Sequence, residues 1–135
     1  MFILKLCTSK KELKEIMYLD RLASKEKTWW KVRSTKNLNN LIKKQQLYLI
    51  NCDNKDVGFL DFNFPNKDLV ILQDVFVLPE FRENGLATLA ISESLKLIKK
   101  KYKLKRIQLV CSESLKVFYE HLGFKLMSVN MVKEL

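Results

Sequence analysis

The sequence predicts a mixed α/β fold in one domain that spans residues 1–135, and three observations support this prediction. The length of 135 residues is typical of one domain, and a hydrophobic fraction of 47% is enough for one core. With only three glycines and two prolines, the chain has no flexible linker or low-complexity segment. Segments of strand-like and helical periodicity alternate, and the expected order is β-α-α-β-β-β-α-β-α-β-β.

The first half of the chain is expected to form three strands and two helices. Ser9 with Glu12 three residues later is a capping-box pattern, which predicts that a helix begins there. Apolar residues at helical spacing from Leu38 onward predict a second helix that begins near Ser34 or Thr35. The expected strands are residues 2–7, 47–51 and 57–64, and the first helix is expected to end near residue 23.

The second half begins with a strand over residues 69–78 and a long amphipathic helix over residues 85–102. One helical stripe consists of apolar residues, namely Ala87, Ile91, Leu95, Ile98 and Tyr102. Gly123 is a natural stop for a short helix, since glycine commonly follows a helix C-terminus. The other expected elements are a strand over 106–111, this short helix over 113–122, and two last strand-like segments over 124–127 and 129–135.

Cysteine and histidine usage restricts the chemistry. Cys7, Cys52 and Cys111 lie far apart, which suits neither a disulfide framework nor a zinc site. His121 is the only histidine, so a metal site or a catalytic triad built on several histidines is excluded. No metal cofactor is therefore expected.

The net charge of +10 is compatible with an anionic ligand, a nucleic acid or an anionic membrane surface. The densest basic run, residues 96–106, contains only Tyr102 as an interleaved aromatic and no RNA-binding signature, which favours a solvated helix end. No apolar run approaches the ~18 residues of a membrane span, and the start lacks signal-peptide features. We expect a cytoplasmic protein without a membrane partner.

Residues 73–87 contain the most informative pattern. A hydrophobic strand ends at Pro79, and Arg82-x-x-Gly85-x-Ala87 then opens a helix. Such a helix start presents unpaired N–H groups and the positive end of the helix dipole, which suits a pyrophosphate. The pattern is neither a dinucleotide fingerprint nor a P-loop. Taken alone, it is better explained by a tight strand-to-helix turn that needs glycine for its conformation.

The stretch 75–87 (VFVLPEFRENGLA) resembles the acetyl-CoA signature of the GNAT acyltransferases, which is a strand, a Pro-Glu-aromatic-Arg turn and Arg/Gln-x-x-Gly-x-Gly/Ala. A second family segment, Tyr-x-x-x-Gly-Phe at a helix end, is similar to residues 119–124 (YEHLGF). Together with the element order, the resemblance covers essentially the whole chain. It implies a GNAT-type domain with a central, mostly antiparallel twisted sheet, a splayed parallel strand pair, and acetyl-CoA as co-substrate.

The resemblance also implies roles for single residues. The main chain of Phe76 and Val77 would bond the pantetheine amides, and an N–H there would polarise the thioester carbonyl. Ser112, where many relatives have asparagine, would bond the pantetheine arm. Tyr119 matches the tyrosine that protonates the leaving thiolate, with a core tyrosine as the alternative. The residues expected to wrap the pyrophosphate with backbone N–H groups are Arg82, Glu83, Asn84, Gly85, Leu86, Ala87 and Thr88.

The general base is not assigned by the resemblance. Relatives that acetylate polyamines often have Glu-Asp where this chain has Gln73 and Asp74, and glutamine cannot accept a proton. Asp74 is the candidate replacement, although adjacent strand residues point to opposite faces. An α-amine, with a pKa of about 7.7, is already partly deprotonated at pH 7, unlike a lysine side chain at about 10.4. The sequence therefore favours an α-amino acceptor over polyamines, which the net charge of +10 also disfavours.

The expected function is direct transfer of an acetyl group from acetyl-CoA to a primary amine in a ternary complex. The alternatives are a coenzyme A-binding module without catalysis and an acetyltransferase acting on an RNA-linked, aminoacyl-tRNA amine. The expected partner is a small-molecule or peptide amine, and a homodimer remains an option. Cys111 is expected in the core and His121 on the surface. Trp29 and Trp30 are expected either to line the acceptor pocket or to pack in the core.

Overall fold

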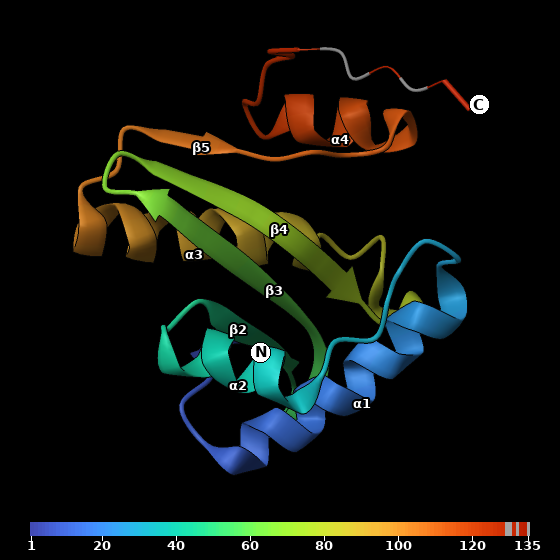
Figure 1. Ribbon diagram of the computed structural model, residues 1–135. Coiled ribbons are helices and arrows are strands. Elements are labelled where there is room, and N and C mark those ends of the chain that lie inside the picture. The colour runs from blue at the N-terminus through green and yellow to red at the C-terminus, as the bar shows by residue number, and fades with distance from the viewer. Residues whose placement is uncertain (129–130, 132, 135) are drawn as a thin grey trace.

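The computed structural model describes residues 1–128, 131, 133 and 134, and its described strands form one five-stranded sheet in the order β1-β2-β3-β4-β5 (Figure 1). The strands are β1 (Phe2–Leu6), β2 (Leu47–Cys52), β3 (Lys55–Asn66), β4 (Leu69–Val77) and β5 (Arg106–Gln108). The helices are α1 (Lys10–Glu26), α2 (Thr35–Lys43), α3 (Leu86–Tyr102) and α4 (Lys116–His121), with short 3-10 turns η1 (Pro79–Phe81) and η2 (Glu113–Leu115).

The sheet is mixed, with one parallel pair at its end. β1 to β4 are antiparallel neighbours, whereas β5 runs parallel to β4. The parallel ladder pairs Leu69 with Arg106 and ends where Ile71 pairs with Gln108, while β4 continues to Val77. The two strands therefore separate, which confirms the prediction of a mostly antiparallel sheet with a splayed parallel pair.

Helices cover both faces of the sheet. In Figure 1, α3 crosses behind β3 and β4, while α1 and α2 lie in front. Phe59 and Phe62 are both fully buried, and because side chains alternate along a strand, they belong to opposite faces. The ring of Phe59 packs edge-on against Trp30, and the ring of Phe62 packs edge-on against Tyr48. Apolar side chains of β3 thus contribute to the core on both faces.

The predicted starts of the first two helices are confirmed in detail. The carboxylate of Glu12 accepts the N–H groups of Thr8 and Ser9, each at 2.9 Å, as a capping box requires. The hydroxyl of Ser34 accepts the N–H of Asn37 at 3.1 Å, which satisfies one free donor at the start of α2. In the described part of the chain, no helix is both long and apolar enough to cross a membrane.

The C-terminal strands differ from the prediction. The expected strand over residues 106–111 ends at Gln108, because β4 diverges there and no neighbouring backbone remains to pair with it. Cys111 is consequently exposed and does not belong to the core. Residues 124–127 form no strand: the contact from Gln108 to Met127 joins two side chains, whereas a strand needs a backbone partner. The last expected strand, 129–135, lies largely outside the described residues.

Candidate active site

A β-bulge interrupts β4 at Gln73. In the β3–β4 register, Asp61 pairs with Asp74 and Phe62 pairs with Leu72, so Gln73 is an additional residue without a partner in β3. Its side chain is exposed. A bulge of this kind inserts one residue and changes which side chains share a face. Alternation read from the sequence therefore does not hold across this position.

The bulge brings Asp74 to the face of the sheet that α1 and α2 cover. Ile71 pairs with Asn63 and Asp74 pairs with Asp61, and residues 61 and 63 share one face of β3. Ile71 and Asp74 consequently lie on that same face, although they are three positions apart. The expectation that strict alternation sets the direction of Asp74 is corrected by this geometry.

Beyond the bulge, part of the main chain of β4 faces the gap left by β5. The N–H of Leu78 donates to the carbonyl of Val57 at 2.8 Å and so points toward β3. Because backbone groups alternate in direction along a strand, the main chain of Phe76 also points toward β3. That of Val75 and Val77 points into the gap. Val77 thus fits the predicted contact to a ligand in the gap, whereas Phe76 is directed away from it.

Arg82 closes the turn that follows β4. Its Nε donates to the carbonyl of Val77 at 2.8 Å, and its terminal nitrogens bind the carboxylate of Glu26 on α1 at 2.5 and 2.6 Å. This hydrogen bonding lowers the pKa of Glu26. The N–H of Arg82 donates to the carbonyl of Pro79 at 3.2 Å, so it is already used within the turn. Arg82 therefore shapes the turn, and its own N–H is not free for a phosphate.

The turn before α3 leaves several other N–H groups free. Glu83 and Gly85 have positive φ values of 66° and 74°, which bend the chain sharply into the helix. The first helical bond runs from the N–H of Leu89 to the carbonyl of Gly85, so the N–H groups of residues 85–88 precede the helical ladder. A Cβ at Gly85 would meet nothing within 4 Å. The predicted residues Glu83, Asn84, Gly85, Leu86, Ala87 and Thr88 all lie at this turn and first helical turn, and free N–H groups at a helix start suit an anion.

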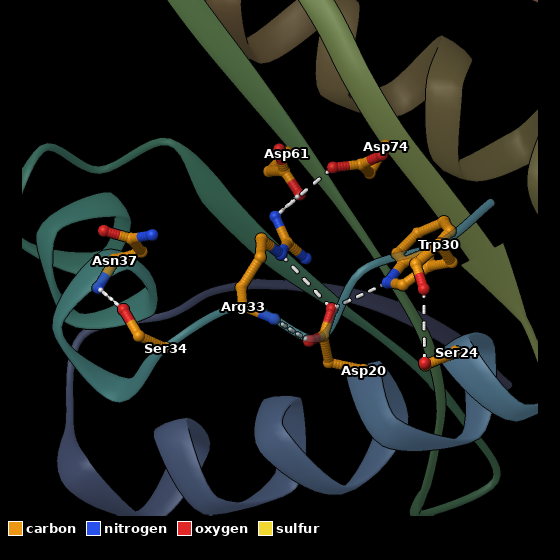
Figure 2. A network of polar contacts seen from close by, with 8 residues as sticks. All are labelled: Asp20, Ser24, Trp30, Arg33, Ser34, Asn37, Asp61 and Asp74. Carbon is orange, nitrogen blue, oxygen red and sulfur yellow. Dashed lines mark hydrogen bonds and ion pairs between the residues drawn. The ribbon is translucent and has the colours of Figure 1, made fainter.

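A buried cluster of charged side chains lies on the α1–α2 face of β3 and β4 (Figure 2). Arg33, in the loop between α1 and α2, binds Asp61 through Nη1 at 2.7 Å and lies 3.4 Å from Asp74. Asp20 accepts the backbone N–H of Arg33 at 2.8 Å and its Nε at 3.2 Å. Asp20 also accepts the indole N–H of Trp30 at 3.1 Å, so both of its oxygens are used.

The cluster carries three carboxylates and one guanidinium. Asp61 is completely buried, and neither its Oδ1 nor the Nη2 of Arg33 has a hydrogen-bond partner among the described residues. Burial raises the pKa of Asp61 to about 7, although the nearby Arg33 acts in the opposite direction. Burial also raises the pKa of Asp74. When all three carboxylates are ionised, the cluster therefore has three negative charges and only one positive charge.

A cavity of about 550 Å³ opens beside this cluster. Arg33 and Asn37 line it from the loop and from α2, and Gln73 and Asp74 line it from β4. Val110, which follows β5, lines the side on which the two strands separate. The cavity thus joins the carboxylate of Asp74 to the splayed region of the sheet.

The two tryptophans do not line this cavity. Trp30 is buried and packs edge-on against Phe59 and Phe76, with ring centroids 5.9 and 6.3 Å apart. Trp29 is 68% exposed. Core packing, one of the two predicted uses, is therefore the role of Trp30.

The remaining predicted residues follow β5 in the chain, and α4 lies beyond β5 as seen from β4 (Figure 1). Tyr119 is half-buried on α4, between the rings of Phe118 and Phe124, and burial raises the pKa of its phenol. Its hydroxyl makes no hydrogen bond within the described part of the chain. Ser112 is exposed, and its hydroxyl lies 2.9 Å from that of Ser114. His121 is exposed, as predicted.

The sequence-based prediction of the site does not include Asp20, Arg33 or Asp61. A signal was present for two of them: Asp61 interrupts the apolar run of residues 57–64, and Asp20 lies four residues after Ile16 on the buried face of α1. Within residues 1–128, 131, 133 and 134, no group of histidine, cysteine and carboxylate side chains is arranged to hold a metal ion.

The comparisons with known proteins agree on one family. The model of the acetyltransferase (GNAT) domain matches residues 43–126, more than half of the chain. A search of curated protein sequences finds no match.

Solved structures share the fold. A GNAT family protein from Xanthomonas campestris pv. campestris is 21% identical, with 97% of this chain and 94% of that chain covered and a TM-score of 0.73. A GNAT family acetyltransferase from Streptococcus pneumoniae is 20% identical, with 99% and 98% covered and a TM-score of 0.73. The aminoglycoside acetyltransferase AAC(6')-Iy, in complex with a bisubstrate analogue of CoA and acetylneamine, is 17% identical, with 99% and 97% covered and a TM-score of 0.77.

Proposed function

This chain belongs to the GNAT family of acetyltransferases, and on that premise we propose that it transfers the acetyl group of acetyl-CoA directly to a primary amine. The whole chain, residues 1–135, would form one such acetyltransferase domain. The observation that carries the proposal is the position of the splay. β4 leaves β5 after Ile71, and the main chain of Val75 and Val77 then faces the gap just before the open turn at Gly85.

The residues around the gap suit the two ends of acetyl-CoA. The free N–H groups of residues 85–88 and the positive end of the α3 dipole are suited to its pyrophosphate. Val75 offers a backbone donor and acceptor, and Val77 its N–H, to the amides of the pantetheine arm, in the way that an added strand would pair; the carbonyl of Val77 already accepts from Arg82. Ser112, on the other side of the gap, offers a hydroxyl to the same arm. A backbone N–H of β4 aimed at the thioester oxygen would stabilise the charge that develops there.

The acceptor amine would enter through the cavity beside Asp74. Its nitrogen attacks the thioester carbonyl, the new C–N bond replaces the C–S bond, and the leaving sulfur takes a proton. Tyr119 is the residue to which we assign that proton, because its phenol remains protonated at neutral pH and lies on the segment that forms the far wall of the gap. Asp74, the predicted replacement for the base, is the carboxylate that lines the cavity, and we assign it to binding the acceptor. The attacking amine would release its proton to solvent in the open cavity.

The coenzyme site is tested by the thermal shift that acetyl-CoA causes. A ligand that binds only the folded state adds about 2.7 kcal/mol at 100 times its dissociation constant. Gly85→Val should remove most of this shift, because the new side chain occupies the open space at the turn. Gly123→Val is the matched control: Gly123 also has a positive φ, of 95°, and also faces open space, but it lies at the end of α4.

Both substitutions should lower the melting temperature of the free protein, because each places a β-branched residue at a positive φ. The expected difference is that the Gly123 variant keeps the shift with acetyl-CoA and the Gly85 variant loses it. If wild type shows no shift at millimolar acetyl-CoA, the proposed function is wrong. Equal shifts in the two variants would instead show that the pyrophosphate does not bind at the Gly85 turn.

A further inference from the structure

The charges around Arg33 do not balance within the protein. The single guanidinium faces three carboxylates: Asp20 from α1, Asp61 from β3 and Asp74 from β4. Asp20 is fully used in anchoring the loop, since its two oxygens accept three hydrogen bonds. Asp61 and Asp74 remain, and they pair directly across two neighbouring strands, where like charges repel.

The burial of Asp61 makes this excess of negative charge unusual. Its side chain is 0% exposed and points into the cluster, where Oδ2 binds Arg33 while Oδ1 has no partner (Figure 2). Both oxygens of a buried carboxylate normally accept hydrogen bonds, because a buried oxygen without a hydrogen bond destabilises the folded protein. The side chain of Asp74, in contrast, is 30% exposed and lines the cavity. The arrangement therefore offers a bound cation a carboxylate it can touch and a second one behind it.

The cation held here is not the amine that reacts. A carboxylate pair stabilises the protonated form of an amine, which has no lone pair with which to attack a thioester. A group bound at Asp74 therefore stays an ammonium or a guanidinium. The reacting amine must be a different group of the same acceptor, placed nearer the splay.

From this geometry we propose that the acceptor is polycationic: it carries a second ammonium or guanidinium group, which Asp74 binds at the wall of the cavity with Asp61 adding its charge from behind. The proposal rests on the proposed function, since it assigns this cavity to the acceptor. It also reverses the sequence-based argument against polyamines. That argument rested on Gln73, which cannot accept a proton, and on the net charge of the whole chain, whereas the local charge beside Asp74 is negative.

The first arm of the test is the binding of 1,4-diaminobutane to the full chain, measured by titration calorimetry at low salt. At pH 8, Asp74→Asn should weaken binding at least tenfold, and Asp61→Asn should weaken it several-fold. Asp68→Asn is the matched control, because it makes the same chemical change in the exposed turn before β4 and should bind like wild type. Unchanged binding in the Asp74 variant, or an equal loss in the Asp68 variant, would overturn the proposal.

The second arm uses pH, since a purely structural role of Asp61 would not respond to it. Burial raises the pKa of Asp61 to about 7, against the attraction of Arg33 and together with repulsion from Asp74 and Asp20. Asp61 therefore gains its charge between pH 6 and pH 8, while a primary amine with a pKa of about 10.4 stays protonated. Wild-type affinity should rise several-fold over this range, and the Asp61→Asn variant should show no rise and match wild type at pH 6. A rise of equal size in both would contradict the role of Asp61.

The third arm separates this inference from the proposed function. Coenzyme A release is measured with 1,4-diaminobutane and with 1-aminobutane, and kcat/KM should be at least tenfold higher for the diamine. Equal values for both amines would refute the polycationic acceptor and leave the acetyltransferase intact. If neither amine is acetylated but diamine binding still depends on Asp74, the cation site is supported and the proposed function fails.

Discussion

Replacing Asp61 with asparagine removes a buried negative charge while keeping the shape of the side chain. The Oδ1 of asparagine can still accept the Nη1 of Arg33, which Asp61 binds at 2.7 Å. What changes is the cost of ionisation, because asparagine never becomes charged. We therefore expect Asp61→Asn to stabilise the protein at neutral pH, which is the opposite of the usual effect of changing a fully buried residue.

The size of this effect follows from the difference between the folded and unfolded pKa values. Burial raises the pKa of Asp61 from 3.8 to about 7. Above the unfolded value, the unfolded chain releases this proton and the folded protein retains it, so stability falls by about 1.4 kcal/mol per pH unit until the folded pKa is reached. The total penalty in wild type is about 4 kcal/mol at pH 8 and less than about 1 kcal/mol at pH 4. The variant lacks this penalty at every pH.

The assay is urea unfolding of both proteins at pH 4, 6 and 8, with a check that the m-values agree. Asp20→Asn serves as the contrasting variant in the same cluster. Because Asp20 accepts three hydrogen bonds, its loss should destabilise by about 3–5 kcal/mol. If Asp61→Asn gives no gain at pH 8, or the same gain at pH 4 and pH 8, then Asp61 does not carry an uncompensated charge and the reasoning is refuted.

Two further predictions concern the gap between β4 and β5. Tyr119→Phe should lower turnover on the order of a hundredfold while leaving the dissociation constant of acetyl-CoA unchanged. If turnover is unchanged under conditions where chemistry limits the rate, Tyr119 is a packing residue and not the proton donor. In Gly58→Ala, the new Cβ would lie 2.3 Å from the carbonyl oxygen of Phe76 and push β4 away from β3. The substitution should therefore destabilise the fold by about 1–3 kcal/mol and weaken acetyl-CoA binding. Equilibrium unfolding and coenzyme titration of the Gly58 variant check this, and an unchanged affinity would show that β4 can shift without affecting the site.

Local signals predict most of the fold. The capping box at Ser9, the cap at Ser34 and the turn at Gly85 each depend on residues a few positions apart, and the structure has all three helix starts where the sequence places them. The order of elements from β1 to α4 follows from periodicity for the same reason. The length of β5 does not follow from periodicity, because a strand ends where its neighbour diverges, and the pattern of residues 106–111 contains no information about β4.

The acidic cluster could not be predicted from motifs. Asp20, Arg33, Asp61 and Asp74 come from four separate segments, and only the packing of α1, the following loop, β3 and β4 brings them together. The direction of Asp74 depends in turn on the bulge at Gln73, which arises from the pairing of two strands. A charged residue within an apolar run, such as Asp61, indicates that a partner exists but does not identify it.

From the short ladder between β4 and β5 we expect two units of different local stability. Three residue pairs join β5 to β4, whereas β2, β3 and β4 are paired along most of their lengths. Opening the segment from β5 through α4 should therefore cost less free energy than unfolding the first four strands, and its amides should exchange with solvent faster. A ligand that lies in the gap and contacts both walls would couple these units. The same splay that makes room for a coenzyme would then make the cooperativity of folding depend on whether that coenzyme is bound.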